Sequence, residues 1–336
     1  MKIRVAIVGY GNIGKAVEKM AQSSDDIDVV GLWTRRRHVV SALGTKVYPQ
    51  FTLLDSRFCG KIDVAILCVG SANDLVDLSL KVASRYSIVD CFDTHAKMWE
   101  YLSALDKISK CANTLAIVGC GWDPGIFSLE RALLAAVMPG SVPQTFWGKG
   151  VSQGHSEAIR RLECVKYAIQ YTIPNEKAIQ EAREGRVDFL PREKHLRDCY
   201  VVADYEEFFD KDAHEVTAEE KKVLESRITE QIVNMPNYFA EYETRVRFIG
   251  EEEFLREHSR AYHAGKVIAC ANDVEGYKSG AEFSLKLDSN PNFTANVMLA
   301  YARANYRMKA ESVNGAKTVL DVPVSYLVGE DGLKFV

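Results

Sequence analysis

An apolar run leads directly into a glycine-rich turn near the start of the chain, and this junction constrains the fold more than any other stretch. Residues 3–8 read IRVAIV, and GYGNIG follows at residues 9–14. A Gly-x-Gly-x-x-Gly string alone is weak evidence, but here it ends an apolar strand and opens a helix. In that context Gly9 permits a tight turn, Gly11 lets the backbone approach a pyrophosphate, and Gly14 allows close helix packing. The stretch predicts a dinucleotide-binding strand–turn–helix unit.

Apolar strands continue to alternate with helix-like segments through the first part of the chain. Strand-like runs lie at residues 28–33, 63–70, 87–92 and 114–120, with helix-like segments such as 73–84 and 97–111 between them. Strands that are apolar on both faces and separated by helices are typical of parallel sheets with crossover connections. We therefore expect an α/β fold with a Rossmann-type doubly wound parallel sheet over residues 1–120.

The pattern changes after an amphipathic stretch at residues 126–138, where Pro139, Gly140 and Pro143 interrupt the chain. Residues 121–150 are therefore the predicted junction. Five strand candidates follow, and they alternate apolar with polar residues, which is typical of a sheet with one solvated face. They cover residues 166–174, 198–204, 242–249, 266–271 and 281–288. We expect an α+β substrate-binding and dimerisation domain with a mixed sheet at 151–292.

Two further segments are predicted to be helical. Residues 207–232 are highly charged, and Thr217 and Glu220 have capping-box spacing ahead of apolar residues. A solvated helix face explains this run better than a binding site does. A last helix is expected at about residues 293–309, and the sequence leaves open whether the segment 293–336 packs back on the first domain.

Charge and cysteine usage exclude several classes of protein. The net charge is -4 and the pI is about 6.0, so no positive field favours a nucleic acid. The first apolar run is too short for a signal peptide and no later run has membrane-spanning length, so we expect a cytoplasmic protein without a membrane partner. The eight cysteines are scattered without Cys-x-x-Cys pairs, and the histidines lack metal-ligand spacing. They are interpreted as reduced core cysteines, with no metal site.

The end of the second strand carries Thr34, Arg35, Arg36 and Arg37 where an acid usually binds the ribose 2′-hydroxyl. A hydroxyl and guanidinium groups suit a 2′-phosphate, so NADP is favoured over NAD. The alternative is a loop of solvated arginines. Residues 70–72, Gly-Ser-Ala, follow the next strand at the edge where a cofactor would lie.

Two acids follow strands of the predicted sheet. Asp90 ends one strand, and Asp123 follows another with Trp122 beside it and Pro124 and Gly125 after it. Each acid alone is better explained as a cap or turn residue. Together, at one sheet edge, they indicate a site that holds a substrate ammonium group.

Seven motifs together resemble the meso-diaminopimelate D-dehydrogenase family, the NADP-linked enzymes of lysine and cell-wall precursor synthesis. The motifs are VAIVGYGNIG, TRRR, CVGSA, VDCFDTH, GWDPGIFS, TFWGKGVSQGHS and LKLDSNPNFTA. They run through nearly the whole chain, and the GWDPG and FWGKGVSQGHS stretches are the most specific. The resemblance implies a reaction in which meso-2,6-diaminopimelate, water and NADP give L-2-amino-6-oxopimelate, ammonia and NADPH. It also implies a homodimer.

The resemblance further implies site residues. The implied cofactor contacts are Gly9, Tyr10, Gly11, Asn12, Ile13, Gly14, Thr34, Arg35, Arg36, Val69, Gly70, Ser71, Ala72, Phe92, Asp93, Thr94, Pro124, Gly125, Ile126, Phe127 and Ser128. The implied substrate contacts are Asp90, Trp122, Asp123, Trp147, Gln153, Gly154, Thr172, Arg197, His263 and Asn290.

The chemistry of the substrate agrees with that set, because diaminopimelate carries two carboxylates and two ammonium groups. Asp90 and Asp123 would hold the reacting ammonium, and one of them is the hypothetical proton acceptor. The distant L-centre would be held by Arg197, Thr172, His263 and Asn290. Fixing the far end would select which carbon loses hydride.

Other interpretations of these residues remain open. Trp147 fits a core aromatic, His263 a loop residue, and Arg197 a surface ion pair with Asp198. For His155 we expect a structural role. A broader D-amino-acid dehydrogenase and a non-catalytic NADP-binding sensor are the alternative functions. Dihydrodipicolinate reductase is disfavoured, because its expected basic His/Lys signature is absent from the sequence.

Overall fold

The computed structural model describes residues 2–70, 74–212, 214–258, 262–329 and 332–335. Its contacts divide the chain into two units, one of Met1–Ala132 with Asn290–Val336 and the other of Leu133–Ser289. These divisions fall within one helix, α4, and just before another, α11. The limits 1–120, 121–150 and 151–292 stay a prediction.

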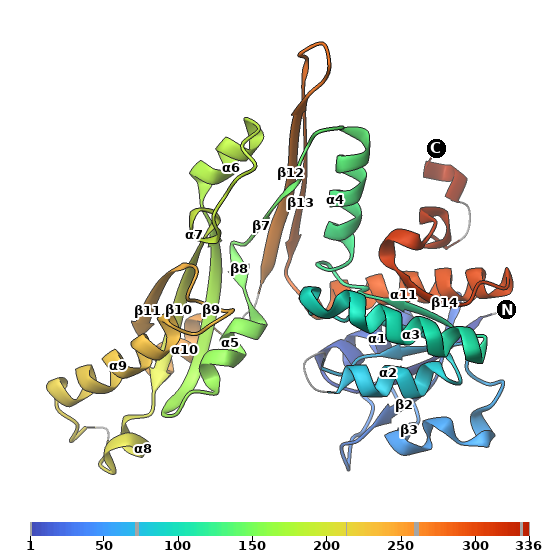
Figure 1. Cartoon of the computed structure of the whole chain (residues 1–336). Helices are drawn as coiled ribbons and strands as arrows, with labels where there is room; N and C mark the ends of the chain where they lie inside the picture. Colours follow the sequence, from blue (N-terminus) through green and yellow to red (C-terminus); the bar gives the residue numbers. More distant parts are fainter. Residues whose placement is uncertain (1, 71–73, 213, 259–261, 330–331, 336) are drawn as a thin grey trace. The chain divides into compact units, whose positions relative to one another are not determined.

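The first unit contains a seven-stranded parallel sheet in the order β14-β6-β5-β4-β1-β2-β3. This confirms the predicted doubly wound fold. The two edge strands of the sheet, β14 and β3, are labelled in Figure 1. The strands are β1 (Ile3–Val8), β2 (Ile27–Thr34), β3 (Val47–Pro49), β4 (Val64–Leu67), β5 (Ser87–Asp90), β6 (Leu115–Val118) and β14 (Gly315–Thr318). The helices are α1 (Asn12–Gln22), α2 (Leu75–Ala83), α3 (Met98–Ala112), α4 (Ile126–Val137) and α11 (Asn290–Ala310). Short 3-10 turns cover Gln50–Leu54, Ser56–Phe58, His95–Lys97, Val319–Asp321, Val324–Tyr326 and Gly332–Phe335.

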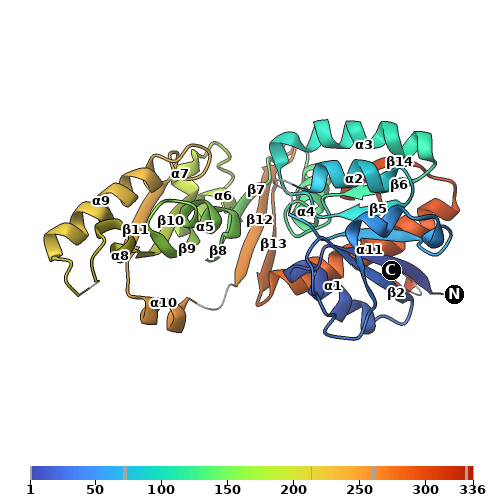
Figure 2. The same ribbon diagram turned by 90° about the horizontal axis from the view of Figure 1, so that it is seen from below.

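Each face of this sheet has its own apolar core. Helices α1 and α11 pack on the face that includes Val5 and Ile7, whereas α2 and α3 pack on the face of Ala6 and Val8 (Figure 2). Because alternate residues of a strand point to opposite faces, strands covered on both sides must be apolar throughout. The uniformly apolar strands seen in the sequence follow from this arrangement.

The last helix returns to the first unit. Helix α11 is largely buried against the sheet, and the Asn305 side chain donates 3.0 Å hydrogen bonds to the carbonyl oxygens of Ile88 and Leu115. Strand β14 then adds to the sheet beside β6. Neither β14 nor β3 was predicted, because both are short and only partly apolar.

The second unit contains two sheets. A four-stranded mixed sheet has the order β11-β10-β9-β8, and a three-stranded antiparallel sheet has the order β13-β12-β7. Its strands are β7 (Gln144–Trp147), β8 (Gly150–Val151), β9 (Val165–Pro174), β10 (His195–Ala203), β11 (Glu243–Phe248), β12 (His263–Asn272) and β13 (Lys278–Leu287). Its helices are α5 (Gln153–Arg160), α6 (Glu176–Arg183), α7 (Pro191–Lys194), α8 (Tyr205–Phe209), α9 (Ala218–Val233) and α10 (Glu251–Glu257).

All five predicted strands of this unit are confirmed, and so is the predicted mixed sheet; the unit also contains a second, antiparallel sheet. The chain changes sheets at Gly148, whose φ of +110° favours glycine. A Cβ there would lie 2.1 Å from the carbonyl oxygen of Thr172, so the strands on either side can separate only because this residue has no side chain.

The predicted helix at 207–232 is interrupted, because its first three residues end one helix and its later part is a second helix. Helix α8 ends at Phe209, and α9 begins at Ala218 after the predicted capping box. The Glu220 N–H donates to Thr217 Oγ1 at 3.2 Å, and the Thr217 N–H donates to Glu220 Oε2 at 2.9 Å. Reciprocal capping starts the helix here, so the charged residues before it are not part of it.

Two other observations concern the whole described chain. Among the residues described, no helix has the length and apolar character needed to cross a membrane. All eight cysteines are free; Cys68, Cys120, Cys199 and Cys270 are buried as expected, whereas Cys59 and Cys111 are exposed and do not belong to a core.

Candidate functional site

The glycine turn between β1 and α1 has the geometry expected of a pyrophosphate site. Gly9 has φ +94°, and a Cβ there would lie 2.7 Å from the carbonyl oxygen of Cys68. A Cβ on Gly14 would lie 2.1 Å from the carbonyl oxygen of Gly9, whereas one on Gly11 would meet nothing within 4 Å. Gly9 and Gly14 therefore serve close packing, and Gly11 leaves space beside the first turn of α1. No side-chain hydrogen bond caps that helix, so its amide dipoles can bind an anion.

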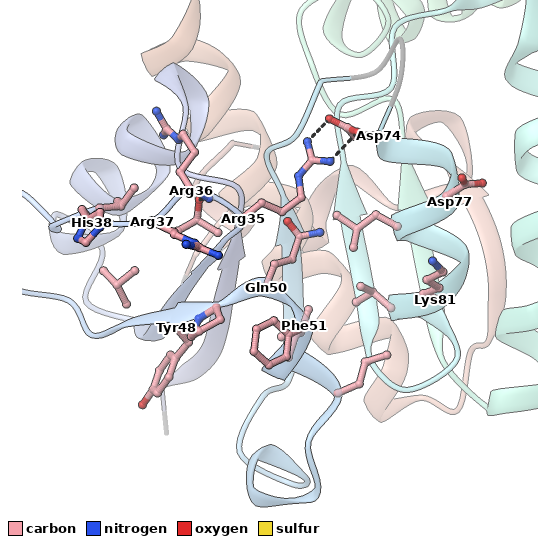
Figure 3. A pocket seen from close by; sticks show the side chains of 18 residues that line it. Arg35, Arg36, Arg37, His38, Tyr48, Gln50, Phe51, Asp74, Asp77 and Lys81 are labelled. Atoms are coloured by element: carbon pink, nitrogen blue, oxygen red, sulfur yellow. Dashed lines mark hydrogen bonds and ion pairs between the residues drawn. The ribbon is translucent and has the colours of Figure 1, made fainter.

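A cavity of about 1160 Å³ lies at the end of β2, and side chains from β2, β3 and α2 surround it (Figure 3). Arg35 forms a bidentate ion pair with Asp74, in which Nη1 donates to Oδ1 at 2.9 Å and Nη2 donates to Oδ2. The Arg36 guanidinium donates to the carbonyl oxygen of Tyr10, and the Arg36 N–H donates to Thr34 Oγ1 at 3.2 Å. The hydroxyl and guanidinium groups of the TRRR stretch thus line one cavity, which suits a phosphate monoester.

The loop after β4 is described only in part. Val69 and Gly70 follow the strand, and a Cβ on Gly70 would meet no atom within 4 Å. The predicted contacts Ser71 and Ala72 lie outside the described residues.

Asp90 is fully buried at the end of β5, where we expected a carboxylate that reaches a ligand. Its Oδ2 lies 2.5 Å from the Tyr101 hydroxyl, and its Oδ1 accepts from the N–H groups of Phe92 at 3.0 Å and Gly119 at 3.3 Å. Burial raises the pKa of Asp90 to about 6, and these hydrogen bonds reduce the increase. The ring of Phe92 packs against Tyr101, and Asp93 and Thr94 continue the loop.

Asp123 lies in the turn between β6 and α4, and its carboxylate forms a bidentate ion pair with the guanidinium of Arg131. Arg131 Nη2 donates to Oδ1 at 2.7 Å and Nη1 donates to Oδ2 at 3.2 Å, while only 2% of the Asp123 side chain is exposed. Trp122 packs edge-on against Phe127, and the Gly125 N–H donates to Ser128 Oγ at 3.2 Å. The turn therefore brings together the predicted contacts Trp122, Asp123, Pro124, Gly125, Ile126, Phe127 and Ser128.

In the second unit, Thr172 and Arg197 face each other across β9 and β10. Arg197 Nη1 donates to Thr172 Oγ1 at 2.6 Å, and the guanidinium lies 4.0 Å from the ring centre of Tyr242. Arg197 is only 5% exposed, and burial lowers its pKa. Within the described part of the chain no carboxylate pairs with it. The neighbouring Asp198 pairs with Arg247 at 3.0 Å instead, so the alternative of an Arg197–Asp198 ion pair is wrong.

Trp147 lies at the end of β7 beside His195, a buried histidine that no sequence pattern selects. The Trp147 N–H donates to His195 Nε2 at 2.9 Å, and the two rings stack with their centres 5.3 Å apart. Burial, with the charges of Arg197 and Lys194, lowers the pKa of His195 to about 3. The neutral His195 fixes the backbone and the indole of Trp147 together.

The remaining predicted residues are more scattered. Gln153 and Gly154 begin α5, His263 begins β12, and Asn290 begins α11, where its Oδ1 accepts from Thr294 Oγ1 at 3.1 Å. His263 is buried, and burial lowers its pKa. Asn290 belongs to the first unit and the other three to the second.

His155 has the structural contacts that we expected. Its Nδ1 lies 2.7 Å from Ser152 Oγ, and its ring packs edge-on against Tyr238 and Phe239. Burial is the main cause that lowers the pKa of His155 to about 4. Gln170 was missed, although its Nε2 donates to Thr172 Oγ1 at 3.2 Å. Gln170 and Tyr242 both lie in stretches that the sequence predicts only as strands, so no sequence signal selects them.

The glycine turn, the arginine-lined cavity and the parallel sheet define the first unit as a Rossmann-type dinucleotide-binding unit. Residues 121–289 match the family model of the diaminopimelic acid dehydrogenase C-terminal domain. The chain is 46% identical over 332 residues to meso-diaminopimelate D-dehydrogenase from Acetivibrio thermocellus, with 97% of this chain and 94% of the relative covered. It is 40% identical to the enzyme of that name from Corynebacterium glutamicum, with 98% and 97% covered. The chain belongs to the diaminopimelate dehydrogenase family.

Solved structures give the same result. The Corynebacterium glutamicum DAP dehydrogenase in complex with DAP has a TM-score of 0.88 and 38% identity, with 99% of this chain and 98% of that chain covered. An engineered D-amino acid dehydrogenase bound to NADP+ has a TM-score of 0.83 and 37% identity, with 100% and 98% covered. The predicted family is therefore confirmed.

Proposed function

We propose that this protein is an NADP-dependent amino-acid dehydrogenase that oxidises the D-centre of meso-2,6-diaminopimelate. The products are L-2-amino-6-oxopimelate, ammonia and NADPH, and the reaction is reversible. Family membership supports the activity. The observation that carries the substrate class is Arg197, a buried cation with no carboxylate partner among the described residues. A buried charge is costly unless an opposite charge reaches it, and a carboxylate of a diacid supplies that charge.

The residues of the first unit fit NADP. Gly9 and Gly14 form a tight turn in which a Cβ on either residue would clash with a backbone oxygen atom. Arg35 and Arg36 line the cavity at the end of β2. The pyrophosphate would lie against the first turn of α1, and the 2′-phosphate against Thr34 and the two arginines. When bound, NADP supplies the hydride acceptor. Its predicted contacts, including Phe92, Asp93 and Thr94, remain proposals.

The side chains have separate tasks in the proposed reaction. The reacting nitrogen must be neutral before hydride leaves, because its lone pair forms the imine, so a proton acceptor is needed. The sequence predicts Asp123 and Asp90 for the roles of acceptor and ammonium ligand, and this proposal assigns both roles to Asp123. Arg197 and Thr172 would hold the carboxylate of the L-centre, with His263 and Asn290 as further predicted ligands. Water then adds to the imine and ammonia leaves.

Positioning of the substrate belongs to the second unit in this proposal. Gln153, Gly154 and Trp147 would contact the carbon chain, with Trp147 fixed by His195. Holding the L-centre determines which hydrogen faces the acceptor, and a misplacement of about 1 Å costs on the order of a hundredfold in rate.

The direct test is the absorbance of reduced nicotinamide when the protein is mixed with NADP and meso-diaminopimelate. We expect turnover with NADP, much less with NAD, and none with the L,L isomer. Equal rates with both isomers would contradict the stereochemical proposal, and NADP binding without turnover would favour the sensor. A panel of other D-amino acids separates the strict enzyme from a broader D-amino-acid dehydrogenase.

Assembly and location are also proposals. We expect a cytoplasmic homodimer built through the second domain, where Val274 and Tyr277 are largely exposed between β12 and β13. Neither a nucleic acid nor a membrane is expected as a partner. Sedimentation of the purified protein tests the dimer, and a monomer at micromolar concentration would contradict it.

A further inference from the structure

Asp90 begins a chain of short contacts between oxygen atoms inside the first unit. Its Oδ2 lies 2.5 Å from the Tyr101 hydroxyl, which lies 2.6 Å from the hydroxyl of Ser79. Ser79 Oγ in turn contacts the carbonyl oxygen of Leu75, one turn earlier in α2. All four residues are buried. The chain therefore joins the end of β5 to α3 and to the backbone of α2.

A count of hydrogens determines the protonation of Asp90. Each of the three contacts needs one hydrogen, because two oxygen lone pairs at such separations repel each other. The hydroxyls of Tyr101 and Ser79 supply two. If Asp90 is ionised, one contact lacks its hydrogen. If Asp90 is protonated, Oδ2 donates to Tyr101, and Tyr101 donates to Ser79. Ser79 then donates to the helix carbonyl, as serines within helices commonly do.

The second carboxyl oxygen fits the same state. Oδ1 accepts from the N–H groups of Phe92 at 3.0 Å and Gly119 at 3.3 Å, which suits the carbonyl oxygen of a neutral acid. With Asp90 protonated, the carboxyl group and both hydroxyls have a donor or acceptor for each contact. A buried cluster that is fully satisfied in this way is stable and rigid.

The surroundings of Asp90 favour the neutral form. Burial is the largest influence on its pKa and raises it to about 6, and no cationic side chain of the described residues contributes. The titratable groups around it are Tyr101 on α3, Cys91 after β5 and Cys120 after β6, and burial raises the pKa of each. The charge of Asp93 also contributes to the raised pKa of Cys91. These neighbours offer Asp90 no positive charge.

We propose that in mildly acidic solution Asp90 is held as a neutral carboxylic acid and that, with Tyr101 and Ser79, it acts as a positioning residue for the loops after β5 and β6. The first loop carries Phe92 and the second leads to Asp123. The role of these loops rests on the proposed function, whereas the protonation state does not. Asp123, in its bidentate ion pair with Arg131, is then the carboxylate whose charge stabilises the substrate ammonium.

Infrared difference spectroscopy of the full-length protein tests the protonation state. At about pH 5 ordinary carboxyl groups are mostly ionised. We expect the parent to show the carbonyl stretching band of a neutral carboxylic acid that Asp90→Asn lacks, and this band should shift in D₂O. Asp123→Asn is the matched control and should keep the band. A parent spectrum identical to that of Asp90→Asn in this region overturns the proposal.

Steady-state kinetics of the same variants tests the positioning role. An asparagine reproduces the neutral acid, because its amide can donate to Tyr101 and its oxygen can accept from Phe92 N–H. We expect the kcat of Asp90→Asn to be about tenfold higher than the kcat of Asp123→Asn. We also expect Asp90→Ala to raise the KM for NADP more than Asp90→Asn does. Equal losses in Asp90→Asn and Asp123→Asn, with both variants folded, would show that the charge of Asp90 is required. If the parent itself has no turnover, the proposed function fails while the infrared result still decides the state of Asp90.

Discussion

Arg197 is the residue whose environment most restricts the ligand. Its guanidinium is buried, donates to Thr172 and lies over the Tyr242 ring. A guanidinium binds a carboxylate through two parallel hydrogen bonds, whereas a lysine ammonium lacks this geometry. We expect Arg197→Lys to lower kcat/KM for meso-diaminopimelate on the order of a hundredfold, which is about 3 kcal/mol. Arg247→Lys is the control, because Arg247 pairs with Asp198 near the surface. Equal effects of the two changes would contradict the role of Arg197.

Asp123 gives a second prediction at this scale. Because its charge would stabilise the substrate ammonium, Asp123→Asn should lower turnover far more than it lowers the affinity for NADP. Titration with NADP and steady-state kinetics separate the two effects. Asp55→Asn is the control, since Asp55 pairs with Arg57 at an exposed position. Turnover of Asp123→Asn within twofold of the parent would exclude a catalytic part for Asp123.

Asp90 predicts a pH dependence of stability. Burial raises its pKa to about 6, while an unfolded chain has the ordinary value near 3.9. The folded state therefore binds this proton more tightly, so the stabilisation is complete below pH 4 and is lost as the pH rises to about 6. Relative to Asp90→Asn, the free energy of unfolding of the parent should fall by on the order of 3 kcal/mol across that window. Urea unfolding of both proteins at several pH values measures this free energy. If the stability of the parent relative to Asp90→Asn rises with pH, the prediction is contradicted.

At the scale of elements, two glycines of the turn have different roles, because Gly14 serves helix packing and Gly11 serves cofactor binding. A Cβ on Gly14 would lie 2.1 Å from the Gly9 carbonyl oxygen, whereas a Cβ on Gly11 would meet no atom within 4 Å. Gly14→Ala should therefore displace α1 from β1 and destabilise the fold by at least about 1–3 kcal/mol. Gly11→Ala should keep the stability but raise the Kd for NADP, because the methyl group occupies the space beside the helix N-terminus. Urea unfolding and NADP titration of both variants decide, and the reverse pattern would refute the assignment.

The strands differ in whether the sequence alone predicts them. The central strands could be predicted, because burial on both faces demands uniformly apolar residues. The short strands β3 and β14 could not, since β14 exists only through its pairing with β6. The change of sheet at Gly148 depends on a close approach to Thr172, which no local pattern encodes.

The same distinction applies to the candidate site. The ends of the predicted strands indicated that Asp90 and Asp123 lie at one edge of the sheet. They did not predict that these acids are buried or that their partners are Tyr101 and Arg131. His195 was missed because it precedes the predicted strand at 198–204, and Gln170 was missed because it lies within a strand whose pattern predicts only burial. A side chain's partners depend on neighbouring strands, so spacing along one strand cannot reveal them.

At the scale of the whole molecule, cofactor binding should increase the stability of the first unit against unfolding. A ligand that binds only the folded state at 100 times its Kd adds about 2.7 kcal/mol to the free energy of unfolding. NADP should therefore raise the unfolding temperature more than NAD does at equal concentration, because the arginine-lined cavity favours the 2′-phosphate. Arg36→Leu should remove most of that difference, whereas Arg85→Leu, a matched change at an exposed position outside that cavity, should preserve it. If NAD and NADP shift the parent equally, the TRRR stretch does not select the cofactor, and the arginines serve only as a solvated loop.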